Sequence, residues 1–411
     1  MSNRLKRILF AVFFVLFSIG VALLIWFVFF RAAVTPPTGV GPGTVPTGSL
    51  PGAGPAEPGG TGTIPTGPGG LPSAGGVPLP GGVLAGAAPQ TVLLRDSVTQ
   101  QVSPSADKQG ARYYDPADGR FYRITTDGIS AALSDQTFPN VEHVEWGNAS
   151  DQAILEFPDG TKLHYDFRTQ TQTTLPKHWE EFDFAPDDRQ MVAKSIALDP
   201  DSRYLIVTDP TGNNPRAVEN LGQNDKKTFP VWTPSSQIVA YAEVGEANGF
   251  DRQSIILVGQ NRENFRALQV EGRGFLPLWS PAGTKVLYSA WTSASEYRPD
   301  LWVSGGDPDN VNKDRIKLNI QTWADKCVWA SESTIYCAVP DTLPTGAGLQ
   351  RSLFATIPDT FYKIDLQSGA QTLLGKPEGA TGAQNLMVTA DERNLLFTDT
   401  VTGRFYDFKI P

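Results

Sequence analysis

The chain has 411 residues and a formal net charge of -9 at pH 7. The first 90 residues carry four basic residues against Glu57 alone, so the negative charge lies in residues 91–411. A body this acidic argues against a nucleic-acid partner, because binding to phosphates requires a basic surface. Residues 91–411 are long enough for one large domain or two small ones.

The N-terminal segment predicts a membrane-spanning helix. Ile8 to Phe30 is a run of 23 uncharged residues rich in Phe, Val, Leu and Ile. As a helix it spans about 34 Å, which is enough to cross a hydrocarbon core of about 30 Å. A cleaved signal peptide is the alternative, and Ala32 and Ala33 keep cleavage open. Its apolar region should, however, be only about 7–15 residues long.

The charges around this run predict its orientation. Three basic residues precede the run, whereas Arg31 is the only Lys or Arg between it and Arg95. The positive-inside rule then places the N-terminus in the cytoplasm and everything after the helix outside it. We therefore expect residues 1–31 to form a cytoplasmic stub and a single-pass helix, with the lipid bilayer as the partner of residues 8–30.

Residues 32–90 predict a flexible linker. Positions 35–90 hold 13 Pro and 17 Gly in 56 residues, with one charge and no aromatic residue. Such a segment cannot bury enough apolar surface to offset its chain entropy. The glycines do not keep the three-residue period of collagen, as Gly59-Gly60 shows. A flexible tether of this length has a root-mean-square reach of roughly 40 Å.

A short unit recurs through residues 91–411: an apolar lead residue, often Trp, then a turn, then an apolar strand. The lead residues are Val102, Trp146, Phe184, Trp232, Trp279, Trp329 and Val388. Their spacings run from 38 to 59 positions. Repeats of about 40–50 residues with Trp or Pro at the turn are typical of β-propeller blades.

Each repeat reads as four short strands bounded by turn residues. In the fourth repeat we expect strands at Phe229–Thr233, Ile238–Glu243, Ser254–Val258 and Phe265–Val270. No long amphipathic helix is predicted in residues 91–411, which argues against a βα fold. The predicted fold class is all-β.

The two ends of this region are predicted to pair in a single blade. The last repeat supplies three strands and lacks an outer one, whereas Thr91–Arg95 is a strand without a partner nearby in sequence. Pairing the two closes the ring and removes an exposed strand edge. This arrangement predicts a seven-bladed propeller over residues 91–411. A six-bladed ring, with residues 91–134 as a separate extension, is the alternative.

The repeats resemble the WD40-like (PD40) repeats of TolB-type propellers, in which W-S-P-D-G marks the turn between the first two strands. Trp279-Ser280-Pro281-Ala282-Gly283 is the best match here, followed by Phe184-Ala185-Pro186-Asp187-Asp188. The resemblance implies a propeller fold and no particular activity. TolB itself has a separate N-terminal domain and a soluble periplasmic form, so its role in the Tol system does not carry over.

Cys327 and Cys337 flank a predicted hairpin whose turn centres on Glu332. In that register the two cysteines lie directly opposite each other, within reach of a disulfide. Two free buried thiols are the alternative. A location outside the cytoplasm favours the disulfide.

Little else in the sequence indicates chemistry. The three histidines lie near the second repeat and read as isolated surface or rim residues: His143, His164 and His178. Residues 307–312 resemble a calcium loop but lack its central Gly and terminal Glu, so we expect a polar loop. The acids around the third turn read as turn residues: Asp183, Asp187 and Asp188. We predict no catalytic residue, metal ligand or cofactor.

A binding surface is the remaining candidate. Three repeats expand the connection between their second and third strands, at Val244–Arg252, Trp291–Pro299 and Pro340–Asp359. In a propeller these connections emerge on the same face. They offer aromatic residues and Arg, the usual anchors of interfaces: Phe250, Arg252, Trp291, Tyr297, Arg298, Leu349, Arg351 and Phe354.

These features predict a membrane-anchored propeller outside the cytoplasm that is not an enzyme. It would act as a binding or scaffold module for a protein, a peptide or an envelope glycan. The alternative is a hydrolase or lyase that acts on polysaccharide with acids in the central channel. That alternative requires converging carboxylates in the channel, which the sequence does not reveal.

Overall fold

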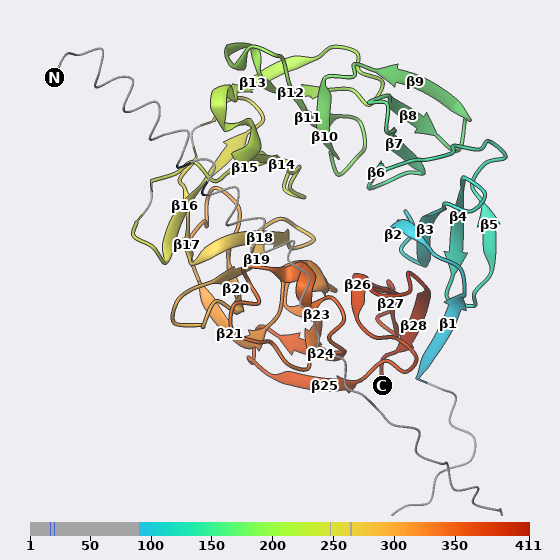
Figure 1. Ribbon diagram of the computed structural model, residues 1–411, viewed down its shortest axis with the longest axis vertical. Helices are drawn as coiled ribbons and strands as arrows, with labels where there is room; N and C mark the ends of the chain where they lie inside the picture. The colour runs from blue at the N-terminus through green and yellow to red at the C-terminus, as the bar shows by residue number, and fades with distance from the viewer. Residues whose placement is uncertain (1–16, 18–19, 21–89, 247, 264) are drawn as a thin grey trace, which may run out of the picture. The chain divides into compact units, whose positions relative to one another are not determined.

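A computed structural model describes residues 17, 20, 90–246, 248–263 and 265–411. In this part of the chain the strands form seven four-stranded sheets around a central axis (Figure 1). The protein is therefore an all-β, seven-bladed propeller, as the repeats predicted. Apart from residues 17, 20 and 90, the predicted transmembrane helix and linker fall outside the described residues, as do their boundaries. Among the described residues, no helix is long and apolar enough to cross a membrane.

Each blade is an antiparallel meander with its first strand at the centre of the ring and its fourth at the rim (Figure 1). Blade 1 comprises β2 (Gln100–Pro104), β3 (Gly110–Asp115), β4 (Arg120–Thr125) and β5 (Ser130–Ala132). Blade 2 comprises β6 (His143–Trp146), β7 (Gln152–Glu156), β8 (Lys162–Asp166) and β9 (Thr171–Leu175). Blade 3 comprises β10 (Trp179–Phe184), β11 (Met191–Ser195), β12 (Tyr204–Thr208) and β13 (Arg216–Asn220).

The remaining blades follow the same plan. Blade 4 comprises β14 (Thr228–Pro230), β15 (Ile238–Ala242), β16 (Arg252–Gly259) and β17 (Leu268–Glu271). Blade 5 comprises β18 (Arg273–Trp279), β19 (Lys285–Trp291), β20 (Pro299–Gly305) and β21 (Ile316–Gln321). Blade 6 comprises β22 (Cys327–Trp329), β23 (Thr334–Pro340), β24 (Asp359–Asp365) and β25 (Gln371–Gly375). In the described part of the propeller, four short 3-10 helices lie in connections: η1 (Pro200–Ser202), η2 (Gly222–Lys227), η3 (Ala324–Lys326) and η4 (Arg351–Phe354). In blade 4, the observed strand ends lie within three residues of the predicted ones.

Both ends of the propeller chain build blade 7. Its inner three strands are β26 (Ala383–Val388), β27 (Asn394–Asp399) and β28 (Phe405–Lys409), and its outer strand is β1 (Thr91–Arg95). β1 pairs antiparallel with β28, with Thr91 opposite Phe408. Figure 1 shows β1 beside β28, close to the C-terminus. The predicted closure of the ring is confirmed.

The hydrophobic core is divided among the interfaces between blades and does not form one central core. Each of its seven clusters joins two consecutive blades, and the last one joins blade 7 to blade 1. Second strands are therefore buried on both faces: β15, with the sequence IVAYA, is buried throughout. The outer strand β21 is exposed at alternate positions along most of its length, because only one of its faces packs on a neighbour.

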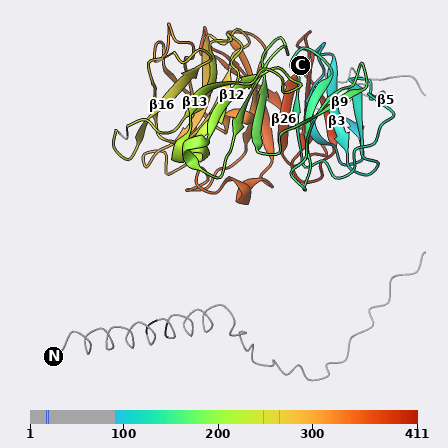
Figure 2. The ribbon, with the colours of Figure 1, turned by 90° about the horizontal axis from the view of Figure 1, so that it is seen from above.

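The strands alternate in direction, so the connections fall on two faces, which Figure 2 shows edge-on. We call the face with the connections between second and third strands the loop face. The connections from one blade to the next lie on it as well. The opposite face carries the turns between first and second strands, and we call it the turn face.

Hydrogen bonds on the turn face fasten each blade to the next. The buried Asp188 of blade 3 accepts bonds from the backbone N–H of Asn148 at 2.6 Å and of Ala149 at 3.0 Å, both in the blade 2 turn. Glu332 of blade 6 accepts bonds from the Ala282 N–H and the Thr284 hydroxyl, both at 2.7 Å. Asp188 lies in the turn between β10 and β11, as predicted, and its carboxylate also connects two blades.

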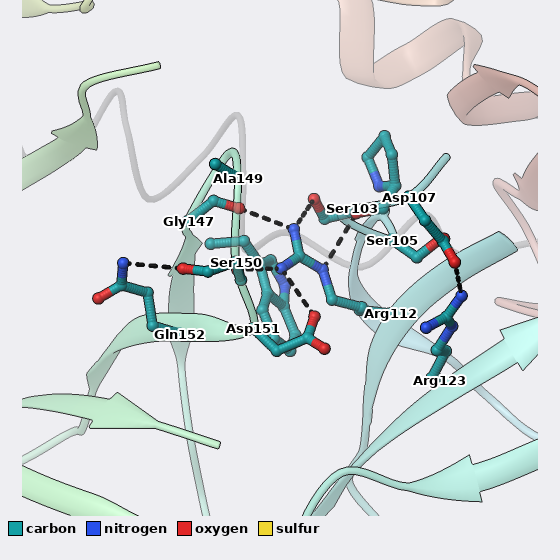
Figure 3. A network of polar contacts seen from close by, with 12 residues as sticks. Ser103, Ser105, Asp107, Arg112, Arg123, Gly147, Ala149, Ser150, Asp151 and Gln152 are labelled. Carbon is teal, nitrogen blue, oxygen red and sulfur yellow. Dashed lines mark hydrogen bonds and ion pairs between the residues drawn. The ribbon is translucent and has the colours of Figure 1, made fainter. Parts of the chain in front are cut away.

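Arg112 of β3 performs the same task between blades 1 and 2 (Figure 3). Its guanidinium donates to the carbonyl oxygens of Gly147 and Ser150 at 2.8 Å each, and to Pro104 at 3.0 Å. The side chain is only 2% exposed and lies over the Trp146 ring at 4.7 Å. Burial lowers the pKa of Arg112 from its ordinary value.

The predicted disulfide is confirmed. Cys327 of β22 and Cys337 of β23 are directly opposite in the register and joined through their sulfur atoms. Both cysteines belong to the hydrophobic cluster between blades 5 and 6.

Candidate functional site

The three expanded connections of blades 4, 5 and 6 all lie on the loop face, as the strand order requires. They span residues 243–251, 292–298 and 341–358. The predicted bounds included five residues that end or begin a strand: Arg252, Trp291, Pro299, Pro340 and Asp359. The third connection, residues 341–358, is longer than most connections in compact domains, and loops of that length are often functional.

Trp291 lies where the three connections meet. Its ring is 6.5 Å from that of Phe250 in the blade 4 connection and 5.7 Å from that of Tyr297 in the blade 5 connection. Gly348 of the blade 6 connection packs against it so tightly that a Cβ there would lie 2.6 Å from the indole. Only glycine permits this approach of backbone to ring.

Backbone hydrogen bonds join the connections of blades 5 and 6 into one surface. The Gly346 N–H donates to the Glu296 carbonyl oxygen at 2.8 Å, and the Gly348 N–H donates to that of Tyr297 at 2.7 Å. On the other side, Arg273 donates to the carbonyl oxygen of Phe250 at 2.7 Å. The surface around Trp291 is therefore held in a defined shape.

The blade 5 connection also carries backbone strain. Glu296 and Tyr297 are consecutive residues with φ of 54° and 59°. Left-handed backbone is unfavourable for a bulky residue such as Tyr, and strain of this kind gathers at functional sites. The next residue, Arg298, has a buried Nε without a hydrogen-bond partner in the described part of the chain.

The other predicted residues lie around this centre and do not all join it. Arg252 pairs with Glu271 on the outer strand β17. Arg351 of η4 pairs with Asp325 at 2.5 Å and stacks over Trp323 at 5.0 Å. Leu349 is 53% exposed, whereas Phe354 is half-buried.

Exposed apolar side chains are concentrated on the loop face. Of the large hydrophobic residues that the described propeller exposes, most lie there: Val98, Leu198, Val244, Phe250, Leu349, Leu353 and Val401. The turn face has Ile129, and the outer strands have Leu93, Ile316 and Leu373. Sequence analysis missed several of the loop-face residues, because short connections gave no signal for exposure.

Two acids lie on the inner strands of neighbouring blades, and sequence analysis did not single them out as a pair. Glu145 and Asp183 occupy equivalent positions in the inner strands β6 and β10, directly before the lead residues of blades 2 and 3. Most of the other blades place apolar residues at this position: Val231, Leu278, Val328 and Met387. The interpretation of Asp183 as a turn residue was wrong, because it lies within β10. The signal available in the sequence was an acidic residue directly before the lead residue of a blade.

The pKa values of both carboxyls are raised. Burial, reinforced by the charge of Glu145, raises the pKa of Asp183 well above its ordinary value. The Trp232 backbone N–H donates to Asp183 Oδ2 at 2.6 Å and opposes this shift. Burial likewise raises the pKa of Glu145. The Glu145 carboxylate in turn raises the pKa of His143, whose Nε2 lies 3.9 Å away.

The remaining predicted sites have ordinary surroundings. His164 is buried on β8 and bonded to the Gln152 amide oxygen at 2.7 Å, so its interpretation as a surface or rim residue was wrong. Burial lowers its pKa. The 307–312 segment is a polar loop in which Asp307 accepts hydrogen bonds from the backbone of Asp309 and Asn310. Within the described residues, no group of three or more His, Cys, Asp or Glu side chains is placed to hold a metal ion.

Comparisons with known proteins bear on the fold. No protein family model matches the chain, and no curated protein matches it significantly. A solved structure of oligogalacturonate lyase in complex with manganese has a TM-score of 0.54 at 13% identity, covering 78% of this chain and 93% of that chain. The β-propeller domain of Cps50 (Swd1) from Myceliophteria thermophila has a TM-score of 0.51 at 12% identity, covering 78% and 100%.

A chain of the mitotic checkpoint complex is similar to the same extent, with a TM-score of 0.51 at 11% identity over 83% of this chain and 98% of that chain. Identities this low show the propeller fold alone. An enzyme and a component of a protein complex both have this fold, so a binding module and a polysaccharide enzyme are both compatible with it. The prediction that the protein is not an enzyme gains no support from these similarities.

Proposed function

We propose that this protein is a binding module that recruits a protein or peptide partner through its loop face. The observation that carries the proposal is the concentration of exposed apolar side chains on that face. Phe250 is 63% exposed and Leu353 is 66% exposed. Exposed apolar groups that gather on one side of a soluble domain mark interaction surfaces.

The construction of the face supports the same proposal. An aromatic anchor binds well when it is held rigid before the partner arrives, because less conformational entropy is then lost. The packing of Trp291 against Phe250 and Gly348 supplies that rigidity. The strained backbone at Tyr297 is consistent with a conformation kept for binding.

The proposed setting is a membrane surface outside the cytoplasm. The run Ile8–Phe30 would anchor the chain, and the Pro- and Gly-rich residues 32–90 would hold the propeller away from the bilayer. Protease added to intact spheroplasts should then digest residues 91–411, and protection of that region would contradict the proposed topology. The turn sequences at Trp279 and Phe184 support a place among TolB-type repeats.

Site-specific photocrosslinking in native membranes tests the docking face. We expect a benzophenone side chain at Phe250 or Leu353 of the full-length protein to capture one defined partner. The matched controls are Ile316 and Leu373, which are 50% and 61% exposed on outer strands. Equal capture at both sets of positions, or none at the loop face, would refute the proposal.

A second candidate function has its own observation. The raised pKa values of Glu145 and Asp183 suit a general acid, because such a group must keep its proton near neutral pH. The protein would then be a hydrolase or lyase that cleaves polysaccharide in the channel. Incubation with oligogalacturonate and with neutral glucans should yield new chain ends that disappear in Glu145→Gln and Asp183→Asn. Activity that persists in both variants, or no activity, would exclude this candidate.

A further inference from the structure

A cavity of about 490 Å³ lies between blades 5 and 6, away from the Phe250–Trp291–Tyr297 cluster and outside the channel. It is lined by the outer strand β21, by β23 and β24, and by the first residues of the blade 6 connection. Its size falls within the range of small-ligand sites, which is about 300–1,000 Å³. Neither the cluster around Trp291 nor Glu145 and Asp183 contribute to its lining.

A buried carboxylate contributes to the lining of this cavity. Asp300 is only 3% exposed, yet it lines the cavity and carries two hydrogen bonds. Its Oδ2 accepts from Lys317 Nζ at 2.6 Å, and its Oδ1 accepts from Gln321 Nε2 at 3.1 Å. Each carboxylate oxygen keeps a free lone pair, and Lys317 keeps further N–H donors. The three side chains form a fixed row of alternating donors and acceptors.

The other walls divide into an apolar side and a polar rim. The apolar side is formed by Leu318, Ile320, Val339, Leu343 and the Tyr362 ring. The polar rim carries the amides of Asn319 and Gln371 and the hydroxyl of Thr342, which have no hydrogen-bond partner within the described part of the chain. These groups each offer donors, acceptors or both to a ligand.

The charges of the cavity balance. Asp300 is paired with Lys317, and Asp341 with Lys376. The cavity therefore lacks the excess of positive charge that would favour a phosphate or carboxylate ligand. A saccharide has an apolar C–H face and a rim of hydroxyls, each of which donates and accepts. That division matches the apolar side and polar rim of this cavity.

We propose that the cavity between blades 5 and 6 binds a neutral saccharide of one or two rings. The sugar ring lies against Tyr362 and the aliphatic side. Its hydroxyls bond to Asp300, Lys317 and Gln321, and to the rim amides of Asn319 and Gln371. This site goes beyond the proposed docking function, because a glycan held here leaves the residues around Trp291 free. The protein would then contact an envelope glycan and a protein partner at once.

Saturation-transfer NMR on the full-length protein in a detergent without a sugar headgroup tests the site. The probes are cellobiose, N,N'-diacetylchitobiose and digalacturonate. We expect at least one neutral disaccharide to receive saturation and digalacturonate to receive none. Failure of both neutral probes, or equal transfer to digalacturonate, would overturn the proposal.

Variants then locate the binding. Asn319→Ala combined with Gln371→Ala should weaken disaccharide binding about tenfold or more, since each loses a hydrogen bond to the ligand. Thr372→Ala, on the same strand but outside the cavity lining, is the matched control. Unchanged affinity in the double variant would place the saccharide elsewhere and refute the assignment. Phe250→Ser should leave saccharide binding intact. Failure of the saccharide proposal would therefore leave the docking proposal standing, and the reverse also holds.

Discussion

Single side chains decide how firmly adjacent blades hold together. Arg112 is buried and reaches across a blade boundary, whereas Arg123, its direct cross-strand partner, forms an exposed pair with Asp107 (Figure 3). The two arginines have the same charge and lie on one hairpin. Removing Arg112 would leave buried carbonyl oxygens without a hydrogen-bond donor, whereas removing Arg123 would not.

We therefore expect Arg112→Met to lower the free energy of unfolding by about 3 kcal/mol. Arg123→Met should lower it by less than about 1 kcal/mol, because exposed ion pairs contribute little. Urea denaturation of the two variants measures both values. Equal losses would mean that the contacts of Arg112 between blades contribute nothing beyond its charge.

Asp183 predicts a pH dependence of stability. Its pKa is raised in the folded protein, so the folded state keeps its proton between the unfolded pKa of about 4 and the higher folded value. Stability then falls as pH rises through this interval and stays lower above it. Asp183→Asn should raise the melting temperature at pH 7, and the gain should shrink as the pH falls toward about 4.

The control for this prediction is Asp187→Asn. Asp187 lies in the adjoining turn and is 61% exposed. Its substitution should leave the melting curve unchanged across the same pH range. If both substitutions have the same effect at pH 7, burial of Asp183 is not the cause.

At the scale of the element, the β22–β23 hairpin shows how far local sequence determines structure. Its turn fixes the register, and the register places Cys327 opposite Cys337. A bond between them closes a short loop and restricts the unfolded chain. In the chain-entropy model this contributes about 2–3 kcal/mol.

Replacing both cysteines by Ala should therefore lower the free energy of unfolding by about 2–3 kcal/mol. Mass spectrometry without reduction should find the two residues linked in protein from its native compartment. Two thiols that react freely with an alkylating reagent would contradict this. Wild-type protein unfolded in the presence of a reductant should match the double variant and serves as its control.

For the whole molecule, β1 has a role that no other outer strand has. In the described propeller, only β1 comes from the N-terminal end of the domain while the other strands of its blade come from the C-terminal end. Its pairing with β28 therefore closes the ring. Without it, β28 would present an unpaired edge. The cluster between blades 7 and 1 would also lose Leu94 from its boundary.

Deleting residues 91–95 should lower the unfolding midpoint and promote aggregation, as thermal unfolding followed by light scattering would measure. Deleting residues 40–85 is the control, because their composition predicts no packing. If both deletions proved equally harmless, closure by β1 would not be what stabilises the ring.

The sequence alone determined the architecture. The recurring lead residues, the turn chemistry and the unpaired strand at Thr91 predict seven blades and their closure. The register of one hairpin predicts the disulfide. Most of these features depend on turns and on pairing between strands that are neighbours in sequence, which short stretches of sequence encode. The pairing of the two chain ends is the exception.

Only the tertiary structure decided which side chains meet across the blades. Glu145 and Asp183 are 38 positions apart, and the strand that carries Asp183 has a register shift between Glu180 and Asp183. A bulge of this kind reverses the faces on which later side chains lie, so alternation cannot predict them. The contact of Trp291 with Gly348 and the cavity beside Asp300 likewise join residues of separate blades. Their positions follow from the packing of one blade against the next, which no local pattern records.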